Sequence, residues 1–226
     1  MKTIVITGTS RGIGLELCQL LAKDASNQII ALSRKISPTL EKLANVHCYS
    51  VDLTQPKSIE NIAEKISQKY AQIDVVIHNA GAIVNKPFAE ISADEFEYVY
   101  QTNVFGVAAL NRIILPYMPK GGHVVTISSM GGIQGSMKFP GLSAYSSSKG
   151  AVITLSELLA EEYKEQGISF NVLALGAVQT EMLAEAFPGY QAPINPANMA
   201  AYIADFSLNG HQYFNGKALQ VSSTTP

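Results

Sequence analysis

Tyr145 and Lys149 lie four positions apart at the start of a segment with a helical pattern of apolar residues. One helical turn separates them, so both side chains are expected on the same face. A lysine ammonium beside a tyrosine phenol favours the phenolate and lowers the phenol pKa toward the range in which it exchanges protons. A carbonyl reduction needs such an acid. The spacing alone is common in proteins and indicates no function by itself.

A glycine-rich turn is the second candidate, because it joins an apolar run at residues 3–6 to a helical pattern. Its sequence is Thr7-Gly8-Thr9-Ser10-Arg11-Gly12-Ile13-Gly14. Glycines allow positive φ values and the close approach of a phosphate, toward which the following helix points free N–H groups. We therefore interpret the turn as a pyrophosphate cradle, with an ordinary strand-to-helix turn as the alternative. It differs from both the GxGxxG and the Walker A patterns.

Ser33, Arg34 and Lys35 follow the second apolar run, residues 28–32, where a βαβ unit meets the adenosine ribose of a dinucleotide. An acidic residue there would bind the 2′-hydroxyl of NAD and repel a 2′-phosphate. Two cations and a hydroxyl instead favour a phosphorylated ribose, and Arg11 could add a further guanidinium. The sequence thus favours NADP(H) over NAD(H), with a solvated loop as the alternative interpretation of Arg34 and Lys35.

The composition favours a small-molecule partner over nucleic acid or a membrane. The 226 residues are 47% hydrophobic and 15% charged, the formal net charge is -2 and the isoelectric point is about 6.1. The sequence has no basic footprint for nucleic acid and no apolar run of the roughly 18 residues that span a membrane. A strand at the very start leaves no room for a signal peptide, and Cys18 and Cys48 suit reduced core positions. We therefore expect a cytoplasmic location.

Alternating strand and helix patterns must position these residues. Further strands are predicted at 46–51, 74–77, 124–127, 169–175 and 218–221, and helices at 13–23, from 38, from 56, behind 92–95, at 145–166 and at 196–208. Nearly continuous apolar strands are typical of a parallel sheet that is covered on both faces. The predicted inward residues of the helix at 145–166 are Val152, Leu155, Leu158 and Leu159. No repeat or linker interrupts the chain, and its length suits one large domain, residues 1–226.

Asp52 and Asn103 are polar residues with two interpretations each. Asp52 ends the third strand, where it could cap the following turn or receive an adenine amino group. Asn103 interrupts an apolar helical pattern, and a buried amide needs partners. It therefore either ties two backbone segments together or holds a water near a site. The glycine-rich loop after Ser129, residues 130–143, carries apolar side chains that could form one wall of a pocket.

Taken together, these stretches resemble the short-chain dehydrogenase/reductase family over nearly the whole chain. The glycine turn, Asn-Ala-Gly at 79–81, Asn103, Ser129 and the Tyr145/Lys149 pair occur in the family's order. The long interval between Ser129 and Tyr145 is similar to that of some NADPH-dependent carbonyl reductases. The resemblance implies a single-domain α/β Rossmann fold, with a doubly wound seven-stranded parallel sheet between helices. It also implies a short substrate lid at about residues 181–195.

The resemblance further implies a role for each matching residue. Tyr145 would protonate the carbonyl oxygen, Ser129 would hydrogen-bond that oxygen, and Lys149 would lower the tyrosine pKa while holding the nicotinamide ribose. Asn103 would anchor a water that links Lys149 to solvent. The implied cofactor contacts are Gly8, Ser10, Arg11, Gly12, Ile13, Gly14, Ser33, Arg34, Asp52, Leu53, Asn79, Ala80, Gly81, Tyr145, Lys149, Val178 and Thr180. No metal site is expected.

Two residues depart from the family pattern. His78 stands where an asparagine is more usual, and Leu175 stands where a proline is more usual. Both could alter how the nicotinamide is gripped, although neither removes a residue that the chemistry needs.

The leading hypothesis is an NADPH-dependent oxidoreductase that reduces a small, apolar ketone or aldehyde. The alternatives are an alcohol dehydrogenase that runs in the opposite direction, an acyl-carrier or pterin reductase, and an NADP-binding sensor with little turnover. Reaction direction follows cofactor ratios, and substrate choice lies in variable loops, so the sequence leaves these open. Outward apolar positions of the helix at 145–166 suggest a homodimer or homotetramer, as is usual in the family.

Overall fold

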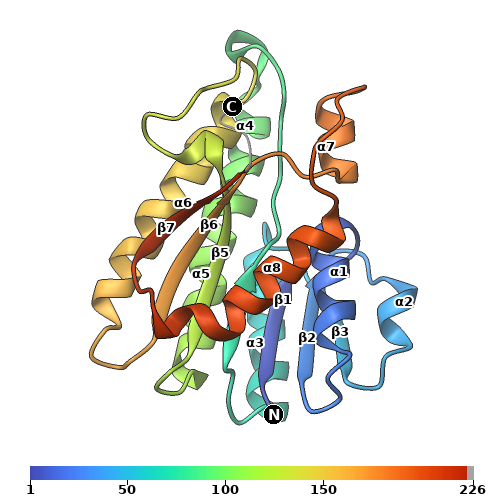
Figure 1. The fold of residues 1–226 in the computed structure, drawn as a ribbon, viewed down its shortest axis with the longest axis vertical. Coiled ribbons are helices and arrows are strands. Elements are labelled where there is room, and N and C mark those ends of the chain that lie inside the picture. The colour runs from blue at the N-terminus through green and yellow to red at the C-terminus, as the bar shows by residue number, and fades with distance from the viewer. Residues whose placement is uncertain (223–226) are drawn as a thin grey trace.

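The computed structural model describes residues 1–222, which contain one sheet of seven parallel strands (Figure 1). The strands are β1 (Thr3–Thr7), β2 (Gln28–Ser33), β3 (Val46–Ser50), β4 (Val75–His78), β5 (His123–Ser129), β6 (Ser169–Leu175) and β7 (Lys217–Val221). Their order is β3-β2-β1-β4-β5-β6-β7. The chain moves outward from β1 to β3 and then returns to the other side of β1, so the order reverses between β1 and β4. The predicted doubly wound parallel sheet is confirmed.

Helices cover both faces of this sheet (Figure 1). The α-helices are α1 (Gly12–Leu21), α2 (Pro38–Glu41), α3 (Pro56–Lys69), α4 (Ala93–Tyr100), α5 (Gly106–Ile114), α6 (Ser143–Glu162), α7 (Glu181–Ala186) and α8 (Pro196–Asn209). A π-helical turn, η2 (Gln101–Phe105), joins α4 to α5. Short 3-10 turns are η1 (Phe88–Glu90), η3 (Leu115–Tyr117), η4 (Met130–Gly132) and η5 (Gly210–Gln212).

Successive side chains of β1 point into two different apolar cores, as the alternation of a strand requires. Ile4 and Ile6 pack with α1 and α8 on one face. Val5 packs with α3, α5 and the end of α6 on the other. A strand that is buried on both sides needs apolar residues at every position, which explains the unbroken apolar runs seen in the sequence.

The predicted element bounds agree with the structure to one or two residues at most ends, but the long helix differs. α6 ends at Glu162 and not at 166, because residues 163–167 form turns before Gly167 adopts a φ of 72°. The predicted inward position of Leu158 is wrong, since this side chain is 64% exposed. The buried residues of α6 include small and polar ones, so apolar periodicity identifies only part of the buried face: Val152 is buried as predicted, and Leu158 is not. The buried residues are Ala144, Ser148, Lys149, Val152, Ile153, Ser156 and Ala160.

Two buried histidines sit in the central strands. His78 Nε2 lies 2.7 Å from Asn111 Oδ1. His123 Nδ1 donates to the Ser207 carbonyl at 3.0 Å, and its Nε2 lies 3.0 Å from Asn171 Nδ2. Burial lowers the pKa of each histidine to about 4, so both rings are neutral at pH 7.

These histidines should make the fold sensitive to mild acid. The unfolded imidazoles bind protons near pH 6.5 and the folded ones only near pH 4, so the unfolded state binds more protons between these values. Between pH 7 and pH 5 the free energy of unfolding should fall by about 2 kcal/mol for each histidine. Urea unfolding at several pH values checks this. The slope of the unfolding free energy against pH gives the number of protons taken up on unfolding, and His123→Asn should lower that number by one. An unfolding free energy that stays constant from pH 7 to pH 5 would contradict it.

Candidate active site

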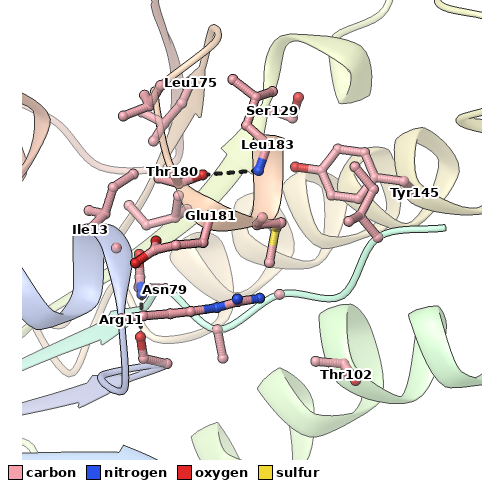
Figure 2. Close-up of a pocket in the computed structure, with 18 of the residues that line it drawn as sticks. Arg11, Ile13, Asn79, Thr102, Ser129, Tyr145, Leu175, Thr180, Glu181 and Leu183 are labelled. Atoms are coloured by element: carbon pink, nitrogen blue, oxygen red, sulfur yellow. Dashed lines mark hydrogen bonds between the residues drawn. The ribbon is translucent and has the colours of Figure 1, made fainter. Parts of the chain in front are cut away.

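A cleft of about 1340 Å³ opens at the carboxyl ends of the strands, where the strand order reverses (Figure 2). Ligands of open α/β sheets bind at such a switch point. The cleft lining contains every residue predicted to bind cofactor or substrate except Gly14 and Asn103, which are buried behind it. The apolar loop residues Met130, Met137 and Phe139 also line the cleft, whereas Ile133 does not.

The glycine turn packs so closely against the end of β4 that side chains would not fit. A Cβ on Gly14 would lie 2.2 Å from the Gly8 carbonyl oxygen and 2.5 Å from Asn79 Nδ2. A Cβ on Gly8 would lie 2.7 Å from Ala80 Cα, and Gly8 itself has a φ of 74°. Only glycine allows this approach. The turn thereby brings the start of α1 to the floor of the cleft.

Asn79 fixes this approach through hydrogen bonds. Its Nδ2 donates to the carbonyl oxygens of Thr7 at 3.1 Å and Gly8 at 3.2 Å. The Thr7 hydroxyl in turn accepts the backbone N–H groups of Asn79 and Ala80. The N-terminus of α1 has no side-chain cap and no acidic residue in its first turn. Its N–H groups are therefore available to an anion in the cleft.

Tyr145, Ser129 and Lys149 come together from α6 and the end of β5. Ser129 and Tyr145 both line the cleft, and Ser129 lies near enough to the phenol to lower its pKa. Lys149 Nζ lies 5.7 Å from the centre of the tyrosine ring and donates to the Ile127 carbonyl at 2.8 Å. The neighbouring Ser128 hydroxyl donates to the Lys149 carbonyl at 2.9 Å, so it is bonded to the backbone of α6. Of the two serines, Ser129 is the one that meets the tyrosine.

Burial governs the protonation of both ionisable groups. It lowers the pKa of Lys149 to about 8. It also raises the pKa of Tyr145, and the nearby Ser129 offsets this only in part. The sequence predicted that Lys149 lowers the pKa of Tyr145, and this prediction is wrong for the protein without a bound ligand. The Lys149 ammonium bonds to the Ile127 carbonyl and does not touch the phenol oxygen, so desolvation prevails.

Asn103 ties two backbone segments together, which was one of its two interpretations. Its Oδ1 accepts from Ala82 N at 2.8 Å, and its Nδ2 donates to the Ala82 carbonyl and to Ser148 Oγ at 2.9 Å each. The amide thus joins the segment after β4 to α6. A Cβ on Gly81 would lie 3.6 Å from both Asn103 Oδ1 and Lys149 Nζ, so Gly81 separates the two groups. The π-helical turn that carries Asn103 is a feature often found at functional sites.

Arg34 and Asp52 lie where the second and third strands end. Arg34 Nη1 donates to the Tyr98 hydroxyl at 3.0 Å, and its guanidinium lies 6.0 Å from the centre of that ring. Asp52 Oδ1 accepts from the backbone N–H and the hydroxyl of Thr54. The turn-capping interpretation of Asp52 is therefore observed. Its contact with adenine stays a prediction.

Among the residues predicted to bind an anion, only Arg11 forms an ion pair with an acidic side chain within residues 1–222. Both of its Nη atoms bond the carboxylate of Glu185, from α7. Thr180, one of the predicted cofactor contacts, accepts from Leu183 N through its Oγ1 at 3.2 Å and so caps α7. The two α7 carboxylates and Tyr98 gave no signal in the sequence, because only the folding of distant segments brings them to the cleft.

The sequence also matches known proteins. Residues 2–191 match the family model described as short chain dehydrogenase. The chain belongs to the short-chain dehydrogenase/reductase family. It is an oxidoreductase, and this family binds nicotinamide cofactors.

Two curated relatives of this dehydrogenase illustrate the family's range. Oxidoreductase UcpA of Escherichia coli is 31% identical over 90% of this chain and 79% of that protein. The 3-oxoacyl-[acyl-carrier-protein] reductase FabG of Thermotoga maritima is 31% identical over 80% of this chain and 76% of its own length.

Solved structures show the same fold. A short chain dehydrogenase of Burkholderia cenocepacia in complex with NADP aligns with a TM-score of 0.88 at 21% identity, over 99% of this chain and 97% of that one. A 4-hydroxyisoleucine dehydrogenase complexed with NADH also has a TM-score of 0.88, at 23% identity over 98% and 97% of the two chains. One neighbour holds NADP and the other NADH, so they leave the cofactor preference open. Within residues 1–222 of this dehydrogenase, no helix has the length and apolar character needed to cross a bilayer.

The two departures from the family pattern fall in different places. Leu175 lines the cleft. His78 is fully buried, bonds Asn111 of α5 and is not part of the lining. Their effect on the nicotinamide stays a prediction, and only Leu175 is placed to act by direct contact.

Gly14→Ala should disrupt both the fold and the cofactor cradle of the dehydrogenase. The new methyl group would overlap the Gly8 carbonyl and the Asn79 amide, and overpacking of this kind costs about 1–3 kcal/mol. Urea unfolding followed by circular dichroism measures the cost, and calorimetry measures nicotinamide-cofactor affinity, which should also fall. Gly150→Ala in α6 is the control, because its nearest contact would be 3.3 Å. Equal stability of the two variants would refute the proposed tight approach.

Proposed function

We propose that this oxidoreductase is an NADPH-dependent carbonyl reductase. It would act on a small, apolar ketone or aldehyde, with Tyr145 as the general acid. One observation carries the proposal: Ser129 and Tyr145 lie near each other in the same cleft that receives the uncapped start of α1. Addition of a hydride to a carbonyl carbon leaves negative charge on the oxygen. Two hydroxyl groups held in place for that oxygen stabilise the charge as it develops.

The residues present fit a dinucleotide cofactor. The turn can pack against the end of β4 only because Gly8 and Gly14 lack a Cβ, and the start of α1 that it brings to the cleft suits a pyrophosphate. When bound, the cofactor supplies the hydride. The proposed contacts are the cleft-lining residues Gly8, Ser10, Arg11, Gly12, Ile13, Ser33, Arg34, Asp52, Leu53, Asn79, Ala80, Gly81, Tyr145, Lys149, Val178 and Thr180.

Tyr145 is well suited to give a proton to the carbonyl oxygen. Its raised pKa keeps the phenol protonated at neutral pH. We propose that the nearby Ser129 hydroxyl donates a second hydrogen bond to the carbonyl oxygen of the substrate. Lys149, with a pKa of about 8, is mostly charged at pH 7 and stabilises the phenolate that remains. Asn103 holds the segment after β4 against α6, and we keep the proposal that it also anchors a water beside Lys149.

Arg34 supports a preference for NADP(H) over NAD(H). It lines the cleft at the end of β2, and its observed partner is the neutral hydroxyl of Tyr98, so its charge remains available to a phosphate. The phenol also holds the guanidinium in one orientation, which reduces the ordering cost of binding. Ser33 lines the cleft beside it.

Apolar side chains around the catalytic residues support the substrate class. Ile83 and the loop residues already named line one side, and three residues of α7 and the following turn line the other: Met182, Leu183 and Phe187. Such a wall suits an uncharged, apolar carbonyl compound. The 3-oxoacyl reductase relative makes an acyl-carrier thioester the second candidate, and a panel of ketones, aldehydes and 3-oxoacyl thioesters separates the two. We propose the segment 181–195 as the substrate lid.

We also propose a homodimer or homotetramer in the cytoplasm. Leu158 on α6 and Phe105 on η2 are 64% and 52% exposed, which suggests a surface that a second copy covers. Both cysteines are free, as suits a reducing compartment. Light scattering at micromolar concentration tests the assembly, and a monomeric mass would exclude it.

Tyr145→Phe tests the proposed function directly. Loss of the phenol should lower the rate of carbonyl reduction by about 100-fold or more, because general acid catalysis contributes that much. NADPH affinity should stay nearly unchanged, since the hydroxyl acts mainly in the transition state. The reduction is followed at the nicotinamide absorbance and the affinity by calorimetry. Tyr190→Phe, which alters another tyrosine of the cleft lining, is the control. Undiminished turnover would remove Tyr145 as the acid.

Arg34→Ala tests the cofactor preference. Affinity for NADPH should fall by about tenfold to a hundredfold, which matches the 1.5–3 kcal/mol of a charge-assisted hydrogen bond. Affinity for NADH should change little, because NADH has no 2′-phosphate. Arg112→Ala removes the same charge from an exposed position of α5 and serves as the control in calorimetry. An equal loss for both cofactors would show that Arg34 does not recognise the phosphate.

A further inference from the structure

α7 presents two carboxylates to the glycine turn. Glu181 and Glu185 are four residues apart in this helix and therefore share a face. Glu185 bonds both Nη atoms of Arg11. Glu181 Oε2 would lie 3.4 Å from a Cβ on Gly12, and Figure 2 shows Glu181 beside Arg11 and Ile13. Negative charge from α7 thus lies in the part of the cleft proposed for the cofactor phosphates.

The position of α7 over the turn is fixed at both ends. Thr180 caps its start through Leu183 N, and Asn85 Nδ2 donates to the Ala186 carbonyl at 2.8 Å. A β-bridge between Val178 and Ile194 closes the base of the segment. Glu185 is therefore held near Arg11 by contacts that do not involve the ion pair itself.

The Arg11–Glu185 ion pair is exposed enough for a competing anion to replace the carboxylate. Its side chains are 48% and 62% exposed, and such pairs contribute at most a modest stabilisation in water. The pairing raises the pKa of Arg11 and lowers that of Glu185, so both groups stay charged at neutral pH. A phosphate dianion offers the same fork of acceptors with more charge, and it can replace the carboxylate.

We propose that Glu185 is a specificity-determining residue, which competes with the 2′-phosphate of NADPH for Arg11 and thereby reduces the advantage of NADPH over NADH. The inference rests on the proposed function, because it requires a nicotinamide cofactor in this cleft. NADH has no 2′-phosphate and leaves the pair intact. Arg34 has a neutral partner and faces no such competition, so the two arginines contribute unequally to recognition of the phosphate.

Calorimetry with NADPH and with NADH tests this in a double-mutant cycle of Arg11→Ala, Glu185→Gln and the double variant. Glu185→Gln should tighten NADPH by about three- to fivefold, the range expected of a half-exposed ion pair. Its effect on NADH should stay below about twofold, and in the Arg11→Ala background the gain for NADPH should disappear. Added salt should reduce the gain, since exposed charges are screened. Glu165→Gln, an exposed acid beyond the end of α6, controls for net charge.

The outcomes separate the inference from the proposed function. If the unaltered protein binds neither cofactor, the proposed function fails and the inference fails with it. If NADPH binds but Glu185→Gln behaves as Glu165→Gln does, only the inference is overturned. An equal gain for NADPH and NADH also overturns it, because that result would reflect general repulsion of the pyrophosphate. If Glu185→Gln still tightens NADPH binding in the Arg11→Ala background, the inference is likewise overturned.

Discussion

The close approach of the glycine turn to the end of β4 is the constraint on which the rest of the cleft depends. Gly8 and Gly14 leave no room for a Cβ, and the Asn79 amide bonds the backbone of the turn from the β4 side. This contact crosses the point at which the strand order reverses. It aims the start of α1 into the cleft and fixes the path of the chain from Asn79 toward the catalytic residues. The proposed phosphate cradle and the proposed catalytic residues thereby share one wall of the cleft.

The catalytic end relies on buried polar groups whose partners are backbone atoms. Asn103 bonds both the N–H and the carbonyl of Ala82, and Lys149 bonds the Ile127 carbonyl. Buried polar groups that are paired in this way favour one arrangement, because an alternative would leave a bonded donor or acceptor without its partner. The same burial sets the chemistry of the site. It keeps the Tyr145 phenol protonated and lowers the Lys149 pKa to about 8. The charged form of Lys149 is stabilised by its hydrogen bond to the Ile127 carbonyl.

Family membership explains the fold and the class of reaction, and α7 shapes a large part of the cleft. Its carboxylates face the glycine turn, and its apolar residues form part of the wall around the catalytic tyrosine. A single short helix therefore contacts the glycine turn and lines the same cleft as Tyr145. The proposed role of Glu185 would link the choice of cofactor to the segment proposed as the substrate lid, through an exposed ion pair.

The sequence by itself indicated the order of strands and helices along the chain, because these follow from local patterns such as apolar strands and a glycine turn. The doubly wound sheet and most of the residues that line the cleft followed from the family resemblance that those motifs carry. Tertiary structure decided which face of α6 is buried, since small and polar residues face the sheet and Leu158 points outward. It also decided the partner of Arg11. Glu185 lies 174 residues away, and no local pattern encodes a contact that only the folded chain brings within hydrogen-bonding distance.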